Sequence, residues 1–174
     1  MAVALARSGK KVIFIDANLR KSVLVGRYKI NKSVKGLTQF LSGINKFEEI
    51  MYGTNVDNLN VVLSGAISPN PELLLGNKVF KTLIKVLKEL YDYIIIDTPA
   101  VELGNDALII AKECDGVVMV VESDMAKTGQ IQLSIDRLKD TRIKILGVVL
   151  NKVNIKNNRY YKKKYDKYSE DTYE

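Results

Sequence analysis

Two aspartates end uninterrupted apolar runs, and acids in that setting are the first sign of chemistry in this sequence. Asp16 follows the run 12–15, and Asp97 follows the run 93–96. If both runs are parallel strands, both acids lie at the sheet edge where ligands bind. A hard cation such as Mg²⁺ takes oxygen ligands, and one or two carboxylates with several waters suffice. The pair therefore indicates a nucleotide–magnesium site, although either acid could instead only end a strand or cap a helix.

A loop that cradles the phosphates should accompany such a site, but the pattern G-x-x-x-x-G-K-S/T is absent from the sequence. The segment 8–11 (SGKK) has a Gly-Lys pair, yet it precedes an apolar run and has no earlier glycine at the right distance. A phosphate loop follows a strand and opens a helix, so that backbone N–H groups point at the anion. The segment 8–11 is therefore rejected as a phosphate loop.

Five short apolar runs are expected to be the strands that position these acids. They are residues 11–16, 59–63, 93–97, 116–121 and 145–150. Their apolar residues are continuous and rich in Val and Ile, which is typical of parallel strands with helices on both faces. Helical spacing occurs between them, over 80–90, 107–111 and 131–138. The alternation predicts an α/β fold with a doubly wound, mostly parallel sheet covered by helices on both faces.

Length and composition bound the function. A chain of 174 residues with 47% hydrophobic residues suits one packed domain, which we expect over residues 1–154. The lack of His excludes Ser–His–Asp catalysis and most zinc sites, and the single Cys114 excludes an intramolecular disulfide. No apolar run reaches the roughly 18 residues of a membrane-spanning helix. The opening segment is a poor signal peptide, so a soluble intracellular domain is expected.

The segment 155–174 is predicted to be a flexible tail. From Asn157 onward it has no aliphatic residue and cannot bury a face. Five of the nine tyrosines lie there: Tyr160, Tyr161, Tyr165, Tyr168 and Tyr173. Stacking on single-stranded nucleic acid would explain them, and so would chance. The net charge of +7 does not favour a nucleic-acid patch, because lysines are spread along the chain and acids dilute the basic tail.

These features resemble the bacterial tyrosine kinases of capsular and exopolysaccharide synthesis, which are P-loop enzymes related to the MinD/ParA ATPases. The resemblance runs from Met1 to about Asn154. It includes Asp16-x-Asn18-x-Arg20, similar to the second Walker motif of these kinases. Further matching segments are 36–43 (GLTQFLSG), 64–65 (SG), 69–74 (PNPELL), 91–99 (YDYIIIDTP), 106–108 (DAL) and 147–151 (GVVLN). The Asp-Thr-Pro motif is shared across the wider ATPase group, whereas PNPELL with a tyrosine-rich tail is more specific to the kinases.

The resemblance implies roles for single residues, with ATP and Mg²⁺ as cofactors. Asp97 resembles the residue that holds Mg²⁺, and Asp16 a carboxylate near the metal and the incoming tyrosine hydroxyl. Asn18 and Arg20 complete the implied catalytic group, where Arg20 could serve phosphate, a subunit contact or a surface pair. Asn151 matches the position that reads the adenine edge, although it could be only a turn residue after a strand.

The resemblance also implies how the protein works in the cell. Neighbouring subunits would phosphorylate one another's tyrosine tails, and each phosphate adds about −1.5 to −2 charge. The family forms ring-like oligomers and works with a transmembrane activator of the polysaccharide co-polymerase type. The expected location is therefore the cytoplasm, at the inner face of the cell membrane through that activator.

The chain departs from the family pattern at three places. Asn18 stands where a second Asp is usual, and Ala100 where a second Pro is common. In the family, the phosphate-loop strand comes directly before a helix that resembles residues 1–9. Met1 is therefore expected to be either an internal methionine of a longer protein or the start of a short product without the loop. We also expect the strand that usually lies between those ending at Asp16 and Asp97 to be missing, and ATP binding to be impaired.

Two alternatives stay open. A MinD/ParA-like positioning ATPase would need an output such as a membrane-binding amphipathic helix, but residues 157–174 lack the apolar face of one. A catalytically dead module that serves as phosphorylation substrate or partner of an intact kinase would explain the missing phosphate loop.

Overall fold

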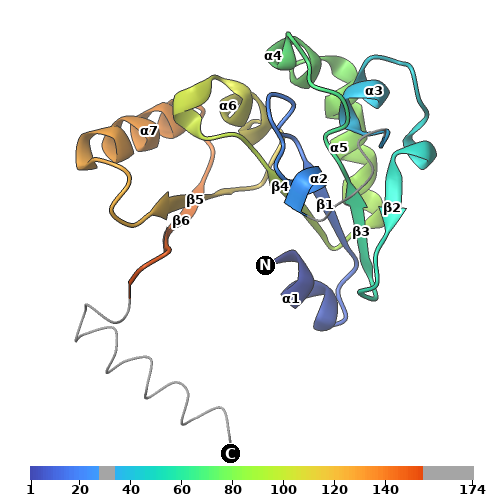
Figure 1. Cartoon of the computed structure of the whole chain (residues 1–174), viewed down its shortest axis with the longest axis horizontal. Coiled ribbons are helices and arrows are strands. Elements are labelled where there is room, and N and C mark those ends of the chain that lie inside the picture. The colour runs from blue at the N-terminus through green and yellow to red at the C-terminus, as the bar shows by residue number, and fades with distance from the viewer. Residues whose placement is uncertain (28–33, 155–174) are drawn as a thin grey trace, which may run out of the picture. The chain divides into compact units, whose positions relative to one another are not determined.

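The computed structural model describes residues 1–27 and 34–154. The chain divides into two compact units, and the boundary along the chain lies between Cys114 and Asp115. The first unit contains a four-stranded sheet, and the second contains a two-stranded sheet (Figure 1). The predicted tail at 155–174 lies outside the described residues. The α/β class and the mostly parallel pairing of the strands confirm the predicted fold.

The sheet of the first unit has the strand order β2-β3-β1-β4. Its strands are β1 (Val12–Asp16), β2 (Met51–Gly53), β3 (Leu59–Val62) and β4 (Tyr93–Asp97). β1 lies in the interior of the sheet and pairs in parallel with both β3 and β4. Three of these strands were predicted, whereas β2 was not. β2 has only three residues and pairs antiparallel with β3, so no apolar run marks it in the sequence.

The strands that end at Asp16 and Asp97 are direct neighbours. They are hydrogen-bonded in register from Val12 opposite Tyr93 to Asp16 opposite Asp97. Within the described residues no strand lies between them, as the sequence led us to expect, and β1 and β4 pair without a gap. In that part of the chain, β4 forms one edge of the four-stranded sheet and pairs with β1 alone.

Helices cover both faces of this sheet. On one face, α1 (Ala2–Arg7) packs Ala6 against Val12 and Leu59. The helices on the other face are α3 (Leu37–Leu41), α4 (Pro71–Leu75), α5 (Lys78–Leu90) and α6 (Asp106–Ala111). Ile13 and Ile15 point to the same face, because side chains alternate along a strand. The helices pack around these two side chains and bury them fully.

Helix α5 shows why the sequence pattern worked. Phe80, Leu83, Ile84 and Leu87 are buried on one side of it, as their spacing predicts. The side chain of Asn77 accepts a hydrogen bond from the Phe80 N–H at 3.0 Å and so caps the helix start. Three shorter elements complete the unit: α2 (Leu24–Arg27), and the 3₁₀ turns η1 (Phe47–Glu49) and η2 (Val101–Leu103).

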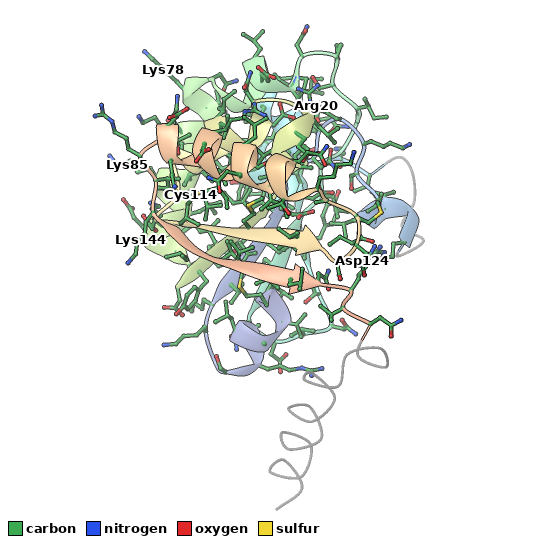
Figure 2. The ribbon with its side chains drawn as sticks, turned by 90° about the vertical axis from the view of Figure 1, so that its left-hand side faces the viewer. Arg20, Lys78, Lys85, Cys114, Asp124 and Lys144 are labelled. Carbon is green, nitrogen blue, oxygen red and sulfur yellow. The ribbon has the colours of Figure 1, made fainter. Side chains whose placement is uncertain are left out.

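Over the described residues 115–154, the second unit is a strand–helix–strand motif. β5 (Val117–Glu122) and β6 (Ile145–Asn151) pair in parallel, and α7 (Thr128–Asp140) connects them (Figure 2). Val121 in β5 and Leu138 in α7 are buried, whereas Val120 remains 62% exposed. Among the helices of the described residues, none has the length and apolar character needed to cross a membrane.

Candidate functional site

The two predicted acids are paired in the sheet. Asp16 and Asp97 are opposite one another as the last residues of two adjacent parallel strands. The Ala17 N–H donates to the Asp97 carbonyl at 2.9 Å, which holds the two strand ends together. The prediction that both acids reach the same edge of the sheet is therefore confirmed. Two apolar runs that each end in Asp were enough to predict this placement, because the carboxyl ends of parallel strands lie at the same edge of a sheet.

The two carboxylates are in different surroundings. Asp16 is 1% exposed, and its oxygens accept hydrogen bonds from the Asn18 N–H at 3.1 Å and from the Ser22 hydroxyl. Asp97 is exposed. Its pKa is raised, first because neighbouring atoms exclude water from part of it, and then because the Asp16 charge is close. A backbone hydrogen bond from Thr98 acts in the opposite direction.

This arrangement suits a divalent cation. Two adjacent carboxylates repel one another, and a cation between them offsets that repulsion. Within residues 1–27 and 34–154, no group of three or more His, Cys, Asp and Glu side chains could hold a metal ion. Two carboxylates are present at this edge, and a cation bound between them would take its other ligands mainly from waters or phosphate oxygens. That is the usual manner in which Mg²⁺ is bound beside a nucleotide.

Asn18 closes a local turn. Its amide donates to the Lys21 carbonyl at 3.1 Å and accepts from the Lys21 N–H at 3.0 Å. Both bonds of its side chain thus shape the loop that follows β1. The catalytic role expected for Asn18 stays a prediction.

Arg20 is half-buried and is held by two acids. Its guanidinium donates to both oxygens of Asp106, from Nε at 2.7 Å and from Nη2 at 3.0 Å. Nη2 also donates to Glu72 at 3.2 Å. The hydrogen bond with Asp106 is the main reason that the pKa of Arg20 is raised. Of the three roles considered for Arg20, the structure shows an ion pair, formed within the first unit. A role toward phosphate stays a prediction.

Asp106 is the polar residue that sequence reasoning missed. It is 1% exposed at the first position of α6, and a charged group is rarely buried without a partner. The sequence analysis included Asp106 only within the segment 106–108 (DAL), because acidic residues are common at the start of helices. The partner that reveals its importance lies 86 positions away in the chain.

Asn151 belongs to the second unit. It ends β6, is exposed, and accepts a hydrogen bond on its side chain from the Lys152 N–H at 2.9 Å. Lys152 has a positive φ of 57°, so this bond supports a tight turn after the strand. The geometry fits the turn explanation, and the adenine-reading role stays a prediction. The five tail tyrosines lie outside the described residues.

Known proteins are similar to this chain in both sequence and fold. Residues 1–148 match the family model described as an AAA domain. The tyrosine-protein kinase CpsD of Streptococcus agalactiae is 43% identical over 154 residues, which are 88% of this chain and 67% of that protein. The chain belongs to the bacterial tyrosine kinases. It spans about two thirds of the length of this kinase relative.

Solved structures agree with membership of this kinase family. The chimeric protein CapA2B2 superposes with a TM-score of 0.82 at 32% identity, over 87% of this chain and 67% of that one. The septum site-determining protein MinD of Pyrococcus horikoshii, solved with Mg-ADP, superposes with a TM-score of 0.69 at 27% identity, over 88% of this chain and 62% of that one. The resemblance to tyrosine kinases with a MinD-like fold is thereby confirmed.

Proposed function

We propose that this chain is the core of an ATP-dependent protein-tyrosine kinase that phosphorylates the tyrosine cluster of its own tail. The single observation that carries the proposal is the adjacent pair Asp16 and Asp97 at the sheet edge, in a chain related to tyrosine kinases. The acceptor residues are Tyr160, Tyr161, Tyr165, Tyr168 and Tyr173. As in the family that it resembles, the kinase regulates capsular or exopolysaccharide synthesis.

Asp97 and Asp16 are the residues that would hold Mg²⁺. Bound Mg-ATP supplies the phosphoryl group and the positive charge that offsets the two carboxylates. Phosphoryl transfer depends mainly on positioning and electrostatics, so the protein needs carboxylates fixed in place more than a strong base. Asp16 is fixed by Asn18 and Ser22, and its remaining lone pairs are able to orient a tyrosine hydroxyl.

The sequence holds no G-x-x-x-x-G-K-S/T loop, so residues 1–174 are expected to bind Mg-ATP weakly on their own. The partners of this function are a transmembrane activator of the polysaccharide co-polymerase type and further copies in a ring-like oligomer. The activator places the kinase in the cytoplasm at the inner face of the cell membrane.

The test is an autophosphorylation assay. The chain is incubated with Mg-ATP, alone and fused behind a strand and phosphate loop taken from CpsD, and phosphotyrosine is then detected by blotting. We expect signal from the fusion and little from the chain alone. The signal should vanish in Asp97→Asn and in a variant with all five tail tyrosines changed to Phe. A folded, ATP-bound fusion without any phosphotyrosine would contradict the proposal.

One further candidate is a catalytically inactive acceptor that an intact relative phosphorylates, because the tyrosine cluster of the tail would suit either role. A trans-phosphorylation assay with CpsD separates the two, and the tail variant shows whether the tail is the acceptor. If CpsD phosphorylates the chain in trans on the tail while the fusion never phosphorylates itself, the acceptor role replaces the kinase role.

A further inference from the structure

Side chains from three segments that follow adjacent strands meet at the guanidinium of Arg20, whose position is labelled in Figure 2. Arg20 itself lies in the loop after β1. Glu72 lies in α4, which follows β3, and Asp106 opens α6, which follows β4. These strands are consecutive neighbours in the sheet order β3-β1-β4. One side chain therefore connects the segments that leave three adjacent strands.

The guanidinium is half-buried, and several groups hold it in place. Asp106 accepts two parallel hydrogen bonds, the geometry in which Arg and a carboxylate bind most specifically. Glu72 accepts from Arg20 and also from the backbone N–H and side-chain amide of Asn105, at 3.1 and 3.2 Å. The backbone passes so close at Gly104 that a Cβ there would lie 2.6 Å from Nη2 of Arg20.

The same loop holds the Asp16 carboxylate. Residues 17–22 turn back so that the Asn18 N–H and the Ser22 hydroxyl both donate to Asp16. Leu19 is 1% exposed, and its carbonyl accepts from the Ser68 N–H at 2.9 Å. Arg20 lies between these two donors in the chain. A displaced Arg20 would therefore move the groups that orient Asp16.

We propose that Arg20, held by Asp106 and Glu72, is a positioning residue for the Asp16 carboxylate and leaves the phosphate charge to other groups. This inference deepens the proposed function, because it assigns a task to the loop beside the Asp16–Asp97 pair. The Nε and Nη2 groups of Arg20 already donate to carboxylates, and turning them toward a phosphate would leave Asp106 buried and unpaired.

Stability and positioning make different predictions for the pair. A buried ion pair contributes little net stability, because its desolvation cost offsets the attraction, and apolar residues of similar volume often replace it at no loss. Removing Arg20 alone leaves a buried charge and destabilises the unit. Changing both residues in Arg20→Met/Asp106→Leu removes the charges and keeps an apolar contact. It also removes the two parallel hydrogen bonds from Arg20 to Asp106 that hold the loop 17–22.

The experiment measures amide hydrogen exchange by NMR on the full chain, without nucleotide or metal. In the double variant, the amides of Ala17 and Asn18 should exchange faster by on the order of tenfold, while those of Ile13 and Phe14 stay within about twofold. Arg20→Lys keeps the charge without the two parallel hydrogen bonds. Its exchange rates at Ala17 and Asn18 should lie between those of the unaltered chain and the double variant. A matched control, Lys35→Met/Glu49→Leu, removes an exposed ion pair with the same 2.7 Å separation and should change neither set.

Unchanged exchange at Ala17 and Asn18 in a folded double variant would overturn the proposal and leave the cluster a merely structural pair. Equal acceleration at all four amides would also overturn it, because that pattern means global destabilisation. A variant too unstable to measure is replaced by Arg20→Lys, which is judged by the same two patterns. Because no nucleotide is present, failure here is separate from failure of the kinase assay.

Discussion

At the scale of single residues, the chemistry depends on one feature, two carboxylates at adjacent strand ends with unequal exposure. Asp16 is buried and receives two donors, while Asp97 is exposed and has a raised pKa because of partial desolvation and the Asp16 charge. The buried acid is oriented by the protein, and the exposed acid faces whatever binds. This division of roles leads to two predictions.

The first prediction is that Asp97→Asn weakens cation binding. Losing one of two carboxylates removes a ligand charge, so affinity for Mn²⁺ as a probe should fall by about tenfold or more. Electron paramagnetic resonance titration of free Mn²⁺ measures this. Asp57→Asn, which changes an exposed acid in another loop, should leave the affinity unchanged. Equal affinities for Asp97→Asn and the unaltered chain would remove Asp97 from the site.

The second prediction concerns pH. The pKa of Asp97 in the folded chain lies above its ordinary value of 3.8, so the folded state binds the proton more tightly than the unfolded state. Folding stability from this group is therefore lost as pH rises through the window that begins near 3.8. In chelator, Asp97→Asn should raise the melting temperature by a few degrees at pH 7, and the gain should vanish near pH 3. A gain that persists unchanged at pH 3 would contradict the electrostatic cause.

At the scale of elements, the loops after β1, β3 and β4 are connected by Arg20 in a manner that no single element reveals. Gly104 in the segment between η2 and α6 makes this close approach possible. Its φ of 166° is ordinary extended backbone, so the requirement for glycine comes from space and not from conformation. A methyl group there has to displace the guanidinium from its two acids.

The third prediction follows from that space. Gly104→Ala should destabilise the chain by about 1–3 kcal/mol, because it disturbs hydrogen bonds to the buried Asp106. Gly129→Ala is the matched control, since Gly129 lies in α7 and a methyl group there would have open space within 4 Å. That change should be neutral or stabilise by up to about 1 kcal/mol, because Ala favours a helix. Urea unfolding measures both; equal effects of the two changes would argue against the steric account.

At the scale of the whole molecule, the two units differ in how well their sheets are covered. In the first unit, β1 has a strand on each side, and the core side chains Ile13 and Ile15 are fully buried. In the described part of the second unit, residues 115–154, Val120 and Val149 remain 62% and 50% exposed on a two-stranded sheet. Two-stranded sheets are marginally stable by themselves.

The fourth prediction is that the units open separately. Amides of β5 and β6 should exchange at least about tenfold faster than those of β1 under native conditions. Met119 and Val148 represent the second unit, and Ile13 and Phe14 represent the first. Native-state hydrogen exchange by NMR gives both sets in one experiment. Equal exchange rates would show that the chain opens as one cooperative body.

The sequence by itself determined the five strands that are apolar runs, the helix α5 and the two acids, because continuous apolar runs and helical spacing are local patterns that packing reinforces. It also carried the kinase resemblance that the comparisons confirmed. Only the tertiary structure decided that the three-residue β2 pairs at all and that Arg20 pairs with Asp106. These facts depend on contacts between segments that are distant in the chain, here 86 positions for the ion pair, and no local pattern encodes which distant partner a side chain meets.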